Sequence, residues 1–336
     1  MAYQSSGSPV FYTNMVEFMV SNGIIPTVTE TGGGLATDTI FKTLPAIPTS
    51  IGRYIFQNTI PFTNQSFVAI LGHTFSIDSV YYSIDDLTNT GFPGESIVNY
   101  SNATNYNGFT IRTAEMEGET EFITQILASV DGSQSTTTAC SLVIGTYYQM
   151  PHSPRLNLTM TKQASGVQRI RTKGGTDLMN YKYTKNPNMW NDIPAWEHWH
   201  NEDDLVNNNL SRIGRRTWSL TFSFLDDKNI FSPTESLSNI IFDSNPYSDE
   251  EGSFWYNDAT EDQDFWDDNY TLLMHDNFFS QVLLKTNGGQ LPFIFQPDSN
   301  DANQGWAICK FDMNSFKFKQ VSNTIYDISL KIKEVW

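Results

Sequence analysis

The chain has 336 residues, of which 14% are aromatic and 17% charged, and its net charge is −17. The negative charge argues against binding along nucleic acid, and no stretch approaches the roughly 18 consecutive apolar residues that a membrane-spanning helix needs. The N-terminus has neither a basic region nor an apolar one behind it. We therefore predict no signal peptide and synthesis in a cytoplasm.

Composition favours sheets with many turns, because aromatic residues recur beside Asn, Thr, Ser and Gly, and apolar residues at helical spacing are scarce. The length suggests two domains. Only two cysteines are present, Cys140 and Cys309, and each lies in an apolar run. We predict two buried free thiols, since reducing compartments rarely support a disulfide.

Residues 1–50 are predicted to form an N-terminal arm or linker. The apolar stretch Phe11–Ile25 could form a brief helix or strand, and three glycines at 32–34 interrupt any regular element after it. Arms of this kind often become ordered only against a neighbouring subunit.

Residues 51–155 are predicted to form a jelly-roll-like β-sandwich. Six β-rich runs are separated by turn residues, and no helical segment of adequate length lies between them. The runs are RYIFQNT, SFVAILGHTF, SVYYSI, FTIRTA, EFITQILASV and CSLVIGTYYQM.

Residues 156–204 are predicted to be an irregular, Trp-rich connection. The strand-like pieces RLNLTMT, which begins at Arg155, and VQRIRTKG precede NPNMWNDIPAWEHWHNEDD, where three tryptophans stand among polar residues. Aromatic side chains are usually buried against another surface, so we predict that this segment is either an exposed binding loop or packs on a partner.

Residues 205–336 are predicted to form a second antiparallel β domain with few short helices. Trp218, Leu220, Phe222 and Phe224 alternate with polar residues, which is typical of a half-buried strand. Further strand-like runs follow the acidic insertion 226–276, and NGG at 287–289 predicts a hairpin turn. These runs are FSQVLLKTNGG, PFIFQPD, GWAICKFDM, SFKFKQVS and TIYDISLKIKEV.

Charge is distributed unevenly along the chain. The range Asp226–Asp276 contains fourteen acidic residues and one basic residue, Lys228. The range 155–185 contains seven basic residues and one aspartate. The two segments suggest charge-complementary contacts between copies, although each could instead be a solvated loop. The residues predicted to form an interface are Arg155, Lys162, Arg169, Arg171, Lys173, Trp190, Trp196, Trp199, Trp255 and Trp266.

Three stretches resemble virion structural proteins of tailed bacteriophages. FVAILGHTF with VYYSI and CSLVIGTYYQMP is similar to their galactose-binding-like jelly roll, and RRTWSLTFSFLDD with LPFIFQPD and WAICKF to the β domain that follows it. The opening GSPVFYTNMVEFM resembles virion proteins of marine tailed phages. The resemblance implies a virion or tail subunit without chemistry of its own.

Candidate metal sites are weak. Glu197, His198 and His200 lie close together in the sequence, but no third and fourth ligand stand at a familiar zinc spacing. The acidic insertion and the segment 297–305 approach a calcium loop without its order of ligands. We predict solvated loops there, and no metal or cofactor.

Catalytic motifs are absent from the sequence. It has no G-x-S-x-G elbow, no G-x-G-x-x-G and no P-loop, and its many acids do not single out a pair for glycoside hydrolysis. His73 is read as a residue that caps a strand. We predict that the chain is not an enzyme.

The leading hypothesis is a structural subunit of a tailed-phage tail, baseplate or neck, located in the virion and in contact with copies of itself and other virion proteins. The alternative is a carbohydrate- or receptor-binding module for host surface glycan, with tryptophans as sugar platforms. Neither hypothesis includes nucleic acid or a membrane as a partner.

Overall fold

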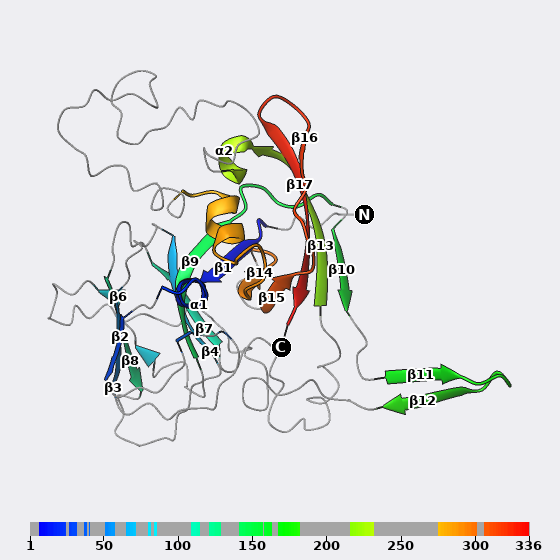
Figure 1. The fold of residues 1–336 in the computed structure, drawn as a ribbon, viewed down its shortest axis with the longest axis horizontal. Helices are drawn as coiled ribbons and strands as arrows, with labels where there is room; N and C mark the ends of the chain where they lie inside the picture. The colour runs from blue at the N-terminus through cyan, green and yellow to red at the C-terminus, as the bar shows by residue number, and fades with distance from the viewer. Residues whose placement is uncertain are drawn as a thin grey trace.

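The fold is mainly β, with antiparallel strands and a few short helices, as the sequence predicts, and it is consistent with a β-sandwich (Figure 1). In the part of the chain that is described, every strand pair is antiparallel. The computed structural model describes residues 7–24, 27–31, 37–38, 40, 51–57, 65–71, 80–81, 84–85, 109–114, 121–128, 141–156, 158–162, 167–181, 216–231, 275–300 and 306–335.

A ten-stranded sheet forms the body, in the order β10-β13-β17-β15-β14-β1-β9-β4-β7, with β16 paired to β17. Its two edges are therefore β10 and β7. The strands are β1 (Val10–Asn14), β4 (Ser66–Leu71), β7 (Phe109–Ala114), β9 (Ser141–Gln149), β10 (Thr159–Lys162), β13 (Arg216–Asp226), β14 (Phe293–Gln296), β15 (Ala307–Phe311), β16 (Phe318–Gln320) and β17 (Ile325–Glu334).

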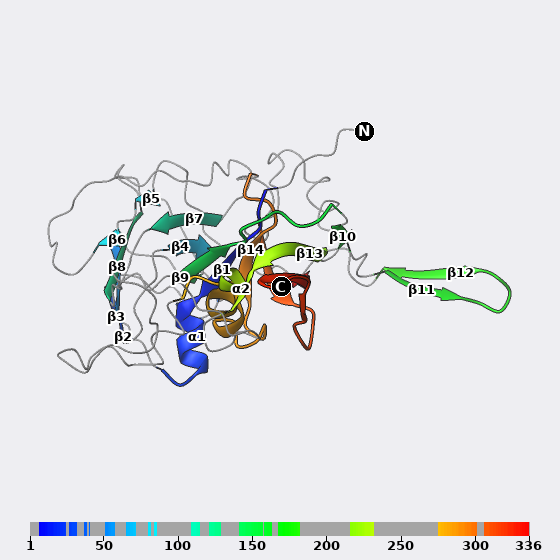
Figure 2. The same ribbon diagram turned by 90° about the horizontal axis from the view of Figure 1, so that it is seen from above.

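A second, five-stranded sheet lies beside the β9-β4-β7 end of the first (Figures 1 and 2). It contains β2 (Thr27–Thr31), β3 (Ile51–Gln57), β5 (Val80–Tyr81), β6 (Ile84–Asp85) and β8 (Glu121–Ala128). A third, two-stranded unit is the hairpin of β11 (Val167–Arg171) and β12 (Asp177–Tyr181), which projects from the opposite end of the molecule.

In the described part of the chain, the helices are α1 (Met15–Ser21), α2 (Asp227–Ile230) and the π-helix η3 (Phe279–Leu284). α1 follows β1 directly because Asn14 caps it: the Asn14 side-chain oxygen accepts hydrogen bonds from the backbone N–H groups of Val16 and Glu17 at 3.1 and 3.2 Å. Within the described ranges, no helix is long and apolar enough to cross a membrane.

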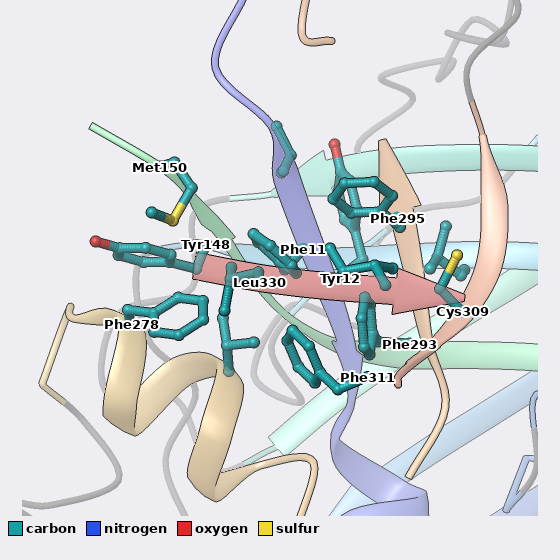
Figure 3. Packing of buried hydrophobic residues seen from close by; sticks show 14 of the residues in the cluster. Phe11, Tyr12, Tyr148, Met150, Phe278, Phe293, Phe295, Cys309, Phe311 and Leu330 are labelled. Atoms are coloured by element: carbon teal, nitrogen blue, oxygen red, sulfur yellow. The ribbon is translucent and has the colours of Figure 1, made fainter. Parts of the chain in front are cut away.

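β1 is the central element of the core. It pairs with β14 on one side and β9 on the other, and the fully buried Phe11 contacts the rings of Phe278, Phe293 and Phe295 at centroid distances of 5.7, 5.6 and 5.2 Å (Figure 3). Such aromatic clusters bury large apolar areas, so β1 joins the two halves of the sheet through packing as well as hydrogen bonds.

The large sheet crosses the predicted domain boundaries. β1 comes from the range predicted as an arm, and the neighbours of β1 come from 51–155 and 205–336. β10 lies within the range predicted as an irregular connection. The division into an arm and two domains itself stays a prediction.

Two local predictions are wrong. Within the run FSQVLLKTNGG, residues Phe279–Leu284 form η3 rather than a strand, and NGG lies in the turn after that helix, with positive φ at Asn287, Gly288 and Gly289. In β13 the predicted alternation holds through Phe222 and then breaks at a bulge. Phe224 has φ of 59° and is 73% exposed, while Leu225 takes the buried position.

Cys309 is a free, buried thiol in β15, as predicted. Burial raises the pKa of the Cys309 thiol, so it behaves as a small apolar residue there. Cys140 lies outside the described residues.

Candidate interaction surface

The β11–β12 hairpin is a narrow arm that carries a basic charge. Its turn is fixed by Thr172, whose hydroxyl donates to the Thr176 carbonyl and accepts from the Thr176 N–H, both at 3.1 Å. Gly175 adopts φ of 85°, which a residue with a side chain rarely takes. The local sequence therefore specifies the tight turn of the hairpin.

The hairpin carries three cationic side chains and one carboxylate. Arg169 forms an ion pair with Asp177, while Arg171 and Lys173 are exposed near the tip. An exposed ion pair of this kind contributes little to stability, about 0 to 1 kcal/mol. The hairpin thus presents a net positive charge on a chain whose total charge is strongly negative.

The other face of the hairpin is apolar at its centre. Ile170 and Leu178 are directly opposite each other and are 55% and 56% exposed. An isolated two-stranded hairpin is marginally stable in water, and an exposed aliphatic pair adds to it only by cross-strand contact. Contact with a second surface would cover this pair.

The nearby edge strand β10 has the same character. Met160 pairs in register with the buried Trp218, so both lie on the core face of the sheet, yet Met160 is 55% exposed. Leu156 and Leu158 are exposed on the same segment. The apolar face of the sheet therefore continues past its covered part to β10, the edge strand among the described strands.

Among the residues predicted for an interface, the structure describes five, which lie on two separate elements: Arg155 and Lys162 flank or end β10, and Arg169, Arg171 and Lys173 lie on the hairpin. Arg155 is half-exposed and donates to Asp327 on β17 at 2.7 Å, and Lys162 ends β10. The five tryptophans predicted for the interface lie outside the described ranges: Trp190, Trp196, Trp199, Trp255 and Trp266. The other candidates outside these ranges are Glu197, His198, His200 and His73.

The segment 297–305 is described as far as Asn300. The Asp298 carboxylate accepts hydrogen bonds from the backbone N–H groups of Gly7 at 2.7 Å and Asn300 at 2.9 Å. It therefore ties the start of β1 to the end of β14. In the described part of the chain, no group of three or more His, Cys, Asp or Glu residues is placed to hold a metal ion.

A buried lysine lies between η3 and β9. The Lys285 ammonium donates to the Thr146 hydroxyl at 2.8 Å and to the Gln281 side-chain oxygen at 2.7 Å. Burial lowers the pKa of Lys285 to about 7, and the Asp276 carboxylate opposes this shift. Because the side chain is fully buried, it is not exposed to a substrate in this structure, and its contacts hold the helix on the sheet.

An internal ion pair closes the sheet near its C-terminal strand. Arg216 makes a two-pronged contact with Glu334, at 2.9 Å and 3.1 Å, and also donates to the Trp306 carbonyl at 2.8 Å. The guanidinium stacks over Trp218 at 5.1 Å from the ring centroid. The contacts of Arg216 are therefore internal ones, in contrast to the hairpin cations.

The sequence predicts the basic charge of the segment 155–178 but not the exposure of its apolar side chains. The missed residues are Leu156, Leu158, Met160, Ile170 and Leu178. The run RLNLTM does alternate, which predicts a strand with one apolar face, but alternation does not tell whether another element covers that face.

Comparison with known proteins adds no relative: no family model, no curated protein and no solved structure matches the chain.

Proposed function

We propose that the chain is a structural subunit without chemistry of its own, which associates with copies of itself through the segment 155–178. The observation that supports this proposal is the concentration of exposed side chains on that segment. Of the eight large apolar side chains exposed in the described part of the chain, five lie there, beside the basic residues of the hairpin. Exposed apolar groups with charges around them are typical of protein interfaces.

The setting of a tailed-phage virion rests on the sequence resemblance alone. In such a particle a subunit acts by the area it shares with its neighbours. The edge strand β10 and the projecting hairpin would suit that role, because a sheet edge and an extended arm both offer contacts to a neighbouring chain.

Replacing the aliphatic pair of the hairpin tests the proposal. The double variant Ile170→Ser with Leu178→Ser removes apolar area that is already half-exposed, so the monomer should fold normally. Loss of its burial at an interface should weaken association by about 2 kcal/mol, or about 30-fold.

The matched control is Val321→Ser, another exposed aliphatic position, in the loop after β16. Light scattering over a range of protein concentrations measures the association of all three proteins. If the double variant and the control associate as strongly as the parent protein, the segment 155–178 is not the interface.

A further inference from the structure

Strands β13 and β17 lie side by side and have one face in the core and one open to solvent (Figure 1). Their alternate residues are buried in the core: Trp218, Leu220, Phe222, Ile328, Leu330 and Ile332. Because successive side chains of a strand point to opposite sides, the residues between them form an outer face. The outer face carries the hydroxyl groups of Thr217, Ser219, Thr221 and Ser329. Thr221 and Ser329 are paired in register, and their hydroxyl oxygens lie 3.3 Å apart.

One end of the outer face is basic. Lys331 and Lys333 of β17 lie there, about 7 Å apart along the strand, and the Lys331 side chain is 51% exposed. Asp312 forms an ion pair with Lys331 at 2.6 Å. Lys310 of β15 pairs in register with Lys333, and its charge opposes the rise that burial causes in the pKa of Glu17. Three lysines against two carboxyl groups leave this end with a net positive charge.

The other end of the outer face presents an aromatic ring. Phe224 lies in the bulge opposite Asp327 and is 73% exposed. Its φ of 59° is in the left-handed region, which a bulky side chain rarely takes, so the backbone is strained there. The Asp327 carboxylate forms an ion pair with Arg155 at 2.7 Å, and Asp226 lies beyond the ring. Asp327 and Lys333 are six positions apart on β17, so the ring and the lysines stand about 20 Å apart.

We infer that the outer face of β13 and β17 binds a linear acidic polysaccharide. The lysines at one end pair with its acidic groups, and the Ser and Thr hydroxyls exchange hydrogen bonds with its own hydroxyl groups. The ring of Phe224 packs against the apolar side of a sugar ring at the other end. The inference is independent of the proposed function, which places self-association on the segment 155–178.

Two other kinds of anionic partner fit the outer face less well. Duplex DNA carries one negative charge per about 1.7 Å of its axis, so the net charge of −17 repels it strongly. An anionic membrane binds a face that inserts several apolar side chains, whereas a row of hydroxyl groups separates the lysines from the ring here. A ligand with many hydroxyl groups and fewer charges therefore suits this face best.

Binding of defined polymers to the full-length protein tests the inference. Polygalacturonate and dextran sulfate are the acidic polysaccharides, and neutral dextran has sugar rings without charge. Polyglutamate has carboxylates without sugar rings, and duplex DNA tests for nucleic acid. Titration calorimetry should show that at least one of the acidic polysaccharides binds at least about 10-fold more tightly than the other three polymers.

Substitutions locate the binding site. Lys331→Gln with Lys333→Gln should weaken this binding at least about 10-fold, whereas Lys331→Arg with Lys333→Arg should keep it. Phe224→Gly should weaken it at least about 3-fold without lowering the melting temperature, because glycine takes a positive φ freely. The matched control, Arg171→Gln with Lys173→Gln, makes the same change of charge on the hairpin and should bind like the parent protein.

The inference is overturned if neither acidic polysaccharide binds, or if polyglutamate or DNA binds as tightly. It is also overturned if the lysine-to-glutamine variant binds like the parent protein, or if the hairpin control loses as much affinity. None of these results bears on self-association, which the hairpin variant Ile170→Ser with Leu178→Ser tests separately.

Discussion

Replacing the buried Lys285 by methionine tests how strongly the core penalises a charge. Burial lowers the pKa of the Lys285 amine in the folded protein to about 7, whereas the pKa in the unfolded chain is about 10.5. Between these two pH values the unfolded state binds more protons, so this group makes the free energy of unfolding rise with pH. The rise is about 1.4 kcal/mol per pH unit, or about 4 kcal/mol from pH 7 to pH 10.

The Lys285→Met variant keeps the length of the side chain and removes the titrating group. We expect the free energy of unfolding of the parent protein minus that of the variant to increase by about 4 kcal/mol between pH 7 and pH 10. Other groups with shifted pKa values, such as Tyr12, whose pKa burial raises, are common to both proteins and cancel in the difference. Denaturant unfolding at several pH values, followed by tryptophan fluorescence, measures this difference. A difference that stays constant across this range would refute the reasoning.

Four further substitutions probe the ion pairs, the close packing of two strands and a buried carboxyl group. Arg216→Met leaves the Glu334 carboxylate buried without its partner and should cost about 3 to 5 kcal/mol of stability in denaturant unfolding, whereas Arg155→Met, at an exposed pair, should cost less than about 1 kcal/mol. Gly145→Ala would place a methyl group 1.8 Å from a backbone oxygen of β1, so we expect a loss of at least about 3 kcal/mol, and an unchanged melting temperature would contradict the close approach of the two strands. Burial raises the pKa of Glu17 to about 7, so its contribution to stability declines as pH rises from 4.5 to 7, and Glu17→Gln should remove that decline from a series of melting curves.

The strands β13 and β17 were predictable because one face of each is exposed to solvent. In β13 and β17 apolar and polar residues alternate over most of the strand, and this period is visible in the sequence. The bulge at Phe224 was not predictable, since one inserted residue reverses which side chain points inward without any change in composition.

Helix η3 and the central place of β1 could not be read from local pattern. Val282 and Leu283 within η3 are buried, and a short apolar run is compatible with both a buried helix and a buried strand. β1 pairs with strands more than a hundred residues away, so its position depends on the whole topology. For the same reason, the charges of the hairpin could be counted in advance, but the exposure of Ile170 and Leu178 could not.

Sedimentation velocity of the purified protein, over a range of protein and salt concentrations, tests self-association most directly. We expect species larger than the 38.1 kDa monomer at low salt, which dissociate as salt rises, because screening shortens the range of charge attraction from about 10 Å at 0.1 M to about 3 Å at 1 M. A monomer at every protein and salt concentration would contradict a structural subunit that assembles through its basic hairpin.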